Sequence, residues 1–290
     1  MHVGLALSRV RTDEKALMRA LSARDHEVTR VDVRDQQFGL SSLPAALADC
    51  DVVLDRCLAA SRSRYLTRFC ERCGVPVVND AATAATCADK VETSLALSAA
   101  GVPTPDTEVA FTPDAALAAV ESFGYPCVLK PVVGSWGRLM AKVDSRTAAE
   151  AVLEHKETLG HYEHSVFYVQ EFVDKPGRDL RVLAADGTPV AAMARSADDW
   201  LTNAAQGADT TPFELDAAAE AVVADASEAV GGGLLGVDLM ETGDSYVCHE
   251  VNHTVEFAAL DETVEVDVPA AVVDWLETSV AGADAQGVTA

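Results

Sequence analysis

The sequence predicts an α/β protein in which an N-terminal lobe with a parallel sheet precedes an α+β region with a mostly antiparallel sheet. Apolar strands and amphipathic helices alternate over the first eighty of the 290 residues, an order typical of a parallel sheet with helices on both faces. Further on, strands follow one another closely, and the turn Asp186-Gly187 favours an antiparallel hairpin. With 49% hydrophobic residues, the chain can bury a full core, and its length suggests two or three lobes.

The elements of the N-terminal lobe follow from the spacing of apolar residues, which is two in strands and 3.6 in helices. We expect a strand at 3–7, a helix at 12–23, strands at 28–33 and 52–55, a helix at 61–73 and a strand at 75–78. No GxGxxG fingerprint occurs among them, so a dinucleotide site is not expected in this lobe.

The remaining elements are bounded by helix caps and turns. Gly101 ends a helical segment that begins at residue 80, whereas Thr112 and Ser145 cap the next two helices. Strands are expected at 126–131, 139–143, 165–172, 180–185 and 189–195, then a helix at 216–230, and a hairpin of strands at 234–240 and 246–251. A last helix starts at Pro269, and residues 283–290 are expected to form a disordered tail.

The charge balance bears on possible partners. The chain has 46 acidic and 22 basic residues, a net charge of -24, and only six of the basic residues are lysines. Such a surface disfavours nucleic acids and anionic membranes as partners. It is typical of halophilic proteins, because molar salt screens the self-repulsion; an acidic protein from a dilute cytoplasm is the alternative. With no long apolar run and no signal peptide, the protein is expected to be soluble and cytoplasmic.

The seven cysteines do not indicate a disulfide framework, because their number is odd and no secretion signal precedes them. Cys70 and Cys73 form a CxxC pair without the second pair that a zinc site needs. We therefore expect them to pack on the core side of a helix.

A glycine-containing turn between two strands is the first candidate for chemistry. Gly134 and Gly137 would let backbone N–H groups approach phosphate oxygens, while Lys130, Arg138 and Lys142 add positive charge. The alternative interpretation is an exposed hairpin turn with solvated charges.

A set of oxygen donors in the last hairpin is the second candidate. Glu250 and Asn252 lie two apart on one strand, so their side chains leave the same face, and Asp238 lies on the preceding strand. Pairing Asp238 with Glu250 requires an odd-numbered loop or a β-bulge. Two carboxylates and an amide suit Mg²⁺, whereas a solvated polar face is the alternative. His249 and His253 are not expected to be ligands, because a hard oxygen site needs no imidazole.

The third candidate is the segment 168–182. The backbone from Glu171 to Val173 could contact the edge of an adenine, with acidic side chains on the ribose. Asp179 and Arg181 share one face of the next strand, and Arg181 could bind phosphate or a substrate carboxylate. A surface ion pair explains Asp179 and Arg181 equally well.

These segments, taken in order, resemble the ATP-grasp ligases over residues 3–281. The likeness is strongest to the RimK-related LysX and ArgX enzymes, here of haloarchaeal type, and it includes the blocks DRC, GSWGRL, EHKE, QEFVDKPGRDLRV, WLTN and HEVNHTVEF. These enzymes attach an amino acid to the C-terminal glutamate of a small acidic amino-group carrier protein of the LysW or ArgW type. The resemblance implies a pre-ATP-grasp lobe at 1–85 and an ATP-grasp domain at 86–282, with subdomains at 86–164 and 165–282.

The resemblance also implies the site residues and cofactors. The cofactors would be ATP and two Mg²⁺ ions, with Mn²⁺ as a substitute, and Asp238, Glu250 and Asn252 would hold the metal. ATP would be bound by Lys90, Lys130, Gly134, Ser135, Trp136, Gly137, Arg138, Gln170, Glu171, Phe172, Val173, Asp179, Arg181 and Asn203. Arg181, Arg195 and Lys130 would act in catalysis, and Arg195 would also contact substrate.

The amino acid to be ligated is inferred from the pair Ala259-Leu260. LysX-type enzymes for α-aminoadipate have Asn followed by Ser or Thr there, and ArgX-type enzymes for glutamate have Gly-Phe. Ala-Leu departs from both but is nearer to Gly-Phe, which favours glutamate and arginine biosynthesis. Use of α-aminoadipate in lysine biosynthesis, or of both substrates, remains the alternative. A ligase that adds glutamate to a protein tail and a nucleotide-binding module without turnover are remoter ones. The fold implies a homodimer or homotetramer.

Overall fold

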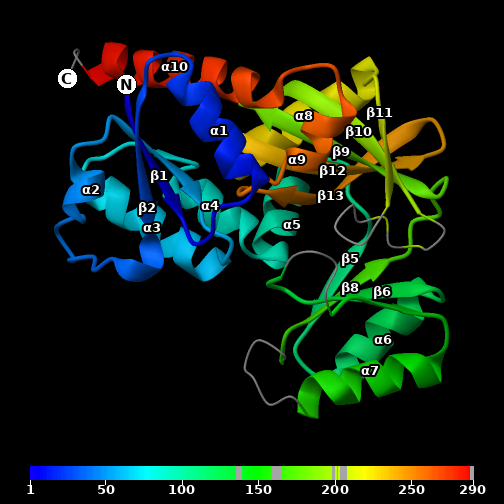
Figure 1. Cartoon of the computed structure of the whole chain (residues 1–290). Helices are drawn as coiled ribbons and strands as arrows, with labels where there is room; N and C mark the ends of the chain where they lie inside the picture. Colours follow the sequence, from blue (N-terminus) through cyan, green and yellow to red (C-terminus); the bar gives the residue numbers. More distant parts are fainter. Residues whose placement is uncertain (135–138, 159–164, 198–199, 201, 203–207, 288–290) are drawn as a thin grey trace.

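The computed structural model describes residues 1–134, 139–158, 165–197, 200, 202 and 208–287, with side chains up to residue 281. In this part of the chain the strands form three sheets (Figure 1). The N-terminal sheet is parallel and the other two are antiparallel, which confirms the predicted fold class. No described helix is long and apolar enough to cross a membrane.

The N-terminal sheet has the strand order β2-β1-β3-β4. Its elements are β1 (His2–Leu7), α1 (Thr12–Ser22), β2 (Glu27–Asp32), η1 (Val33–Asp35), α2 (Ala45–Ala48), β3 (Val52–Arg56), α3 (Ala60–Arg72) and β4 (Val77–Val78). Its two central strands are buried along almost their whole length, as expected when both faces are covered. One face packs against α1 and α10 (Val268–Gly287), and the other packs against α2 and α3. Cys70 lies in this second layer, as predicted.

The middle sheet has the order β5-β8-β6-β7 and is covered by two helices (Figure 1). Its elements are β5 (Thr107–Ala110), α6 (Pro113–Phe123), β6 (Cys127–Lys130), β7 (Ala141–Val143), α7 (Arg146–Thr158) and β8 (Phe167–Glu171). The short strand β5 was not predicted. The helical segment from residue 80 is two helices, α4 (Ala81–Cys87) and α5 (Lys90–Ala99). The Asp89 side chain caps the N-terminus of α5 by accepting hydrogen bonds from the backbone N–H groups of Val91 and Glu92.

The C-terminal sheet has the order β11-β10-β9-β12-β13. Its elements are β9 (Arg178–Ala185), β10 (Thr188–Ser196), β11 (Asp209–Pro212), α8 (Ala217–Val230), β12 (Leu234–Thr242), β13 (Ser245–Asn252) and α9 (Ala258–Thr263). Helix α8 covers one face with the largest hydrophobic cluster. The opposite face carries the polar residues described below. Helix α10 continues to Gly287, into the segment for which the sequence predicts a tail.

Candidate active site

A β-bulge in the last hairpin brings the three predicted metal ligands together. Asp238 on β12 is directly opposite Glu250 on β13, but the next pair is Leu239 with Cys248, so His249 is the extra residue. A β-bulge is one of the two arrangements that the sequence analysis gave for pairing Asp238 with Glu250. Asn252 lies two pairs further along, opposite Gly236, and its Nδ2 is 3.5 Å from Asp238 Oδ2. All three side chains leave the same face of the sheet.

Two guanidinium groups contact the Asp238 carboxylate, which is only 1% exposed. Arg181, its neighbour on β9, lies 2.7 Å from Oδ1 through Nε and 2.9 Å from Oδ2 through Nη2. Arg195 on β10 donates from Nη2 to Oδ1 at 2.9 Å. Since these cations converge on one carboxylate from two further strands, the face combines anionic oxygens with groups that can bind a phosphate or a substrate carboxylate.

Asp179 forms a buried ion pair in this structure, the alternative that the sequence offered for this residue. Its Oδ1 accepts from Arg195 Nε at 2.7 Å, and its Oδ2 accepts from the Thr202 hydroxyl and lies 3.5 Å from Lys175 Nζ. The side chain is 5% exposed. The ion-pair alternative therefore describes Asp179 better than a ribose contact does, although the pair is buried and its partner is Arg195 rather than Arg181.

Two lysines lie beside the carboxylates. Lys90, the first residue of α5, donates to Glu250 Oε1 and to the Gly134 carbonyl, both at 2.9 Å. Burial alone would raise the pKa of Glu250, but the charge and hydrogen bond of Lys90, together with the charge of Lys130 and other neighbours, outweigh it and lower the pKa to about 2. Lys130 is buried and donates to Gln170 Oε1 at 2.5 Å, and loss of hydration lowers its pKa to about 8. Both ammonium groups thus lie next to the carboxylates predicted to hold the metal.

A pocket next to this face collects the residues predicted to surround the nucleotide base. Its lining includes Lys130, Gln170, Glu171, Phe172 and Val173. The Glu171 carboxylate also accepts from the backbone N–H of Asp106 at 2.9 Å, which holds the end of β8. An apolar, concave wall with a few polar groups is what a purine requires.

The bulged His249 was not predicted as a site residue. It lines this pocket, and its buried Nε2 has no hydrogen-bond partner among the described residues. Burial lowers its pKa to about 3, so the ring is neutral. The β-bulge, which the sequence analysis gave as only one of two alternatives, turns this side chain towards the pocket.

The three oxygen donors fit a hard divalent cation, since two carboxylates and an amide are the ligands that Mg²⁺ prefers. Among the described residues, no group of three or more His, Cys, Asp and Glu side chains could hold a metal, so the site depends on the amide of Asn252.

Several predicted residues do not join this arrangement. Leu260 on α9 is fully buried in a hydrophobic cluster, so its side chain has no surface through which to contact a substrate. Ala259, partly buried beside it, packs against the same cluster. The remaining predicted residues, Ser135, Trp136, Gly137, Arg138 and Asn203, lie outside the described residues.

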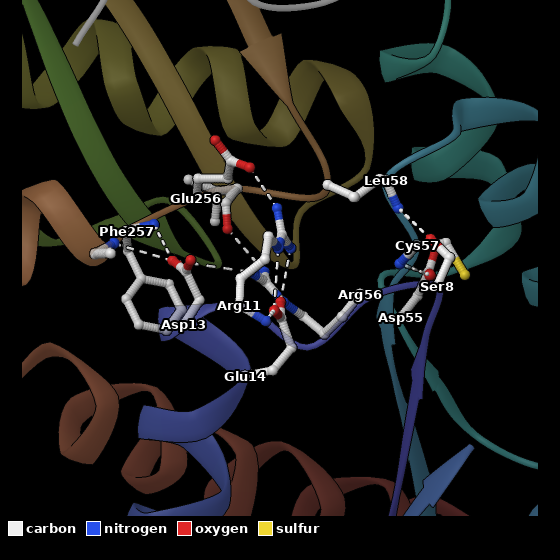
Figure 2. A network of polar contacts seen from close by, with 12 residues as sticks. Ser8, Arg11, Asp13, Glu14, Asp55, Arg56, Cys57, Leu58, Glu256 and Phe257 are labelled. Carbon is white, nitrogen blue, oxygen red and sulfur yellow. Dashed lines mark hydrogen bonds and ion pairs between the residues drawn. The ribbon is translucent and has the colours of Figure 1, made fainter. Parts of the chain in front are cut away.

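A buried polar network, which the sequence did not reveal, connects the N-terminal lobe to the loop that follows Asn252 (Figure 2). Arg56 donates from Nε to Glu14 at 3.0 Å and from Nη1 to the carbonyl of Val255 at 2.7 Å. The Asp13 carboxylate accepts from the backbone N–H of Phe257 at 2.6 Å. The loop is thereby held by charged groups from α1 and β3.

Two further contacts hold the start of the same loop. Asn79 donates from Nδ2 to the carbonyls of Leu234 and His253, at 2.8 and 2.7 Å. The ring of His253 lies 2.9 Å from the Ser63 hydroxyl on α3, and Ser63 in turn donates to Asp55. The residue adjacent to Asn252 is thus tied to the N-terminal lobe.

The lowered pKa of Lys130 has a testable consequence. Because the ammonium loses its proton as the pH rises through about 8, the kcat/KM for ATP should fall above that pH, by about tenfold per pH unit at the limit. Lys130→Arg keeps its charge and should remove this alkaline decline in pH-rate profiles. Lys15→Arg, at an exposed lysine on α1, is the control and should retain it. An identical decline in both variants would assign the titration to another group.

Comparisons with known proteins agree with this geometry. Residues 3–86 match the model of the LysX preATP-grasp domain, and residues 87–276 match that of the RimK-like ATP-grasp domain. An α-aminoadipate–LysW ligase LysX from Saccharolobus solfataricus is 35% identical over 211 residues, which cover 72% of this chain and 77% of that protein. A glutamate–LysW ligase ArgX from Sulfolobus acidocaldarius is 29% identical over 282 residues, which cover 96% and 99%.

A solved structure is similar over nearly its whole length. The RimK domain ATP-grasp protein from Sphaerobacter thermophilus is 29% identical with a TM-score of 0.77, covering 95% of this chain and 99% of that one. The match of the two family models over consecutive segments, together with the ligases of similar sequence, identifies the chemistry of amide-bond formation. The chain therefore belongs to the LysX/ArgX family of RimK-like ATP-grasp ligases.

Proposed function

We propose that this ligase joins the amino group of glutamate to the side-chain carboxylate of the C-terminal glutamate of a LysW-type carrier protein, at the expense of ATP, in arginine biosynthesis. The proposal is supported by one observation above all, the face on which Asp238, Glu250 and Asn252 meet Arg181 and Arg195. Relatives whose names specify glutamate or α-aminoadipate and LysW support the substrate classes.

The chemistry takes place in two steps. The carrier's carboxylate attacks the γ-phosphorus of ATP, which gives an acyl phosphate and ADP. The amine of the amino acid then attacks the acyl carbon, inorganic phosphate leaves, and a proton is lost from nitrogen. Lys90 and Lys130 bind the phosphates, and Arg181 and Arg195 orient the carboxylate and offset negative charge. Asp238, Glu250 and Asn252 would hold magnesium, which would supply positive charge to offset the negative charge of the transferring phosphoryl group.

Glutamate is favoured over α-aminoadipate because Ala259-Leu260 is nearer to the Gly-Phe of ArgX enzymes. Because Leu260 is buried, its side chain would influence the choice of amino acid through the packing of α9 rather than through contact with the substrate. α-Aminoadipate remains the second candidate, since the LysX relative has the higher identity, although over a shorter segment than the ArgX relative.

The test is a competition experiment. A recombinant LysW-type carrier is incubated with the enzyme, Mg-ATP and equal concentrations of glutamate and α-aminoadipate, and the mass added to the carrier is measured. The added mass of glutamate should dominate, with stoichiometric ADP release. A carrier that lacks its terminal glutamate is the control and should gain no mass. Dominance of α-aminoadipate would reassign the enzyme to lysine biosynthesis, and no added mass would contradict the proposed acceptor.

A further inference from the structure

Basic residues are concentrated in the N-terminal lobe. Residues 1–85 contain 12 of the 22 lysines and arginines but only 11 of the 46 acidic residues. All of the surplus negative charge of the chain therefore lies in residues 86–290, which contain 35 acidic and 10 basic residues. An acidic partner would be repelled by that part and could approach the N-terminal lobe with less electrostatic cost.

Within this lobe, one exposed face of helix α3 carries three arginines. Arg64, Tyr65, Arg68 and Arg72 are spaced so that they project from the same side at 3.6 residues per turn; we call them the α3 arginine face. All four side chains are exposed, and Tyr65 is 61% exposed. The opposite side of the helix, with the buried residues Ser63, Leu66, Thr67 and Cys70, packs on the sheet. The arginines thus point away from the protein.

None of these three arginines forms an ion pair with a described carboxylate, although acidic residues outnumber basic ones about two to one in the chain. Some arginines elsewhere on the surface do have such partners, whereas others, such as Arg19 and Arg30, have none among the described residues. Arg24 pairs with Asp274, Arg34 with Asp32, Arg146 with Glu150, and Arg178 with Glu241. A partner with its own carboxylates could bind the α3 arginine face without breaking an internal ion pair, so less of the Coulomb gain would be lost.

The position of α3 links this face to the active site. The Ser63 hydroxyl, in the first turn of the helix, lies 2.9 Å from the ring of His253, the residue after Asn252. From there the helix runs along the side of the N-terminal sheet opposite α1 and α10 (Figure 1). The arginines extend over about 12 Å, at 1.5 Å per residue. The start of α3, where Arg64 lies, is therefore the end of this face that is nearest to Asn252.

We propose that the α3 arginine face docks the folded part of the acidic carrier protein while the carrier's C-terminal glutamate enters the active site; this inference rests on the proposed function. The arginines supply charge complementarity, and exposed Tyr65 offers the kind of aromatic anchor that is enriched at protein interfaces. A nucleic acid is a poorer fit, because a long polyanion would also meet the acidic surface of the remaining chain.

The test compares two acceptors with two variants. The docking variant is Arg64→Gln/Arg68→Gln/Arg72→Gln. The charge-matched control is Lys15→Gln/Arg19→Gln/Arg30→Gln, at exposed positions elsewhere on the same lobe. Each is assayed with a recombinant LysW-type carrier and with a synthetic peptide of the carrier's C-terminal tail. For the docking variant we expect the carrier KM to rise about 10-fold with little change in kcat, while kcat/KM for the peptide is unchanged. The control should leave both acceptors unaffected, and added KCl should reduce the difference.

The outcomes separate this inference from the proposed function. If the wild-type enzyme ligates neither acceptor, the proposed function is wrong, and the docking surface with it. If the wild-type enzyme is active but the docking variant keeps its carrier KM, the surface assignment is wrong and the proposed function stands. Equal losses with carrier and peptide would also overturn docking, because the substitutions would then act on the active site itself.

Discussion

Replacing Asp238 by asparagine is expected to lower kcat by at least about 100-fold, because the substitution removes a proposed metal ligand and the shared partner of two guanidinium groups. Asp238 is 1% exposed and bound to both Arg181 and Arg195. Stability should fall as well, since breaking a buried ion pair leaves charge unpaired and typically costs about 3–5 kcal/mol. Single-turnover ADP formation, measured where circular dichroism shows the variant folded, separates the two effects.

Glu241→Gln provides the matched control. Glu241 lies on the same strand, and it forms a similar two-pronged ion pair, with Arg178 at 2.6 and 2.7 Å. It lies three residues from Asp238, so its side chain leaves the opposite face of the sheet, and its amide variant should retain turnover. Equal activity of Asp238→Asn and Glu241→Gln would refute the magnesium assignment.

The second large effect is expected at the junction of the N-terminal lobe and the C-terminal loop. Arg56→Met removes a 3% exposed guanidinium from the buried Glu14 carboxylate and from the carbonyl of Val255. We expect a loss of about 3–5 kcal/mol in the free energy of unfolding, because Glu14 keeps only Arg11 as a partner. Chemical denaturation at constant salt measures this loss.

Arg34→Met is the control for that substitution. Arg34 pairs with Asp32 in the same lobe but is more than half exposed, so solvent can replace its partner and the unfolding midpoint should not change. A wild-type midpoint for Arg56→Met would show that the network in Figure 2 makes no net contribution to stability.

Features that depend on local pattern were predictable from the sequence. The alternation of strands and helices in the first lobe, the Thr112 cap and the spacing of Glu250 and Asn252 are all determined within a few residues, because periodicity and capping are short-range effects. Short strands such as β5 and β11 lack enough residues to show a period, and their place depends on a neighbouring strand.

The tertiary structure alone decided how the site is assembled. The bulge at His249, the pairing of Asp179 with Arg195, and the contact of Arg56 with Val255 join segments that are distant in the sequence or depend on strand register. The burial of Leu260 likewise results from packing between helices. The sequence by itself determined the fold class, the family resemblance and the elements on which the candidate site residues lie. Which of them meet was decided by three-dimensional packing, because hydrogen-bond geometry and burial between distant segments exist only once the chain has folded.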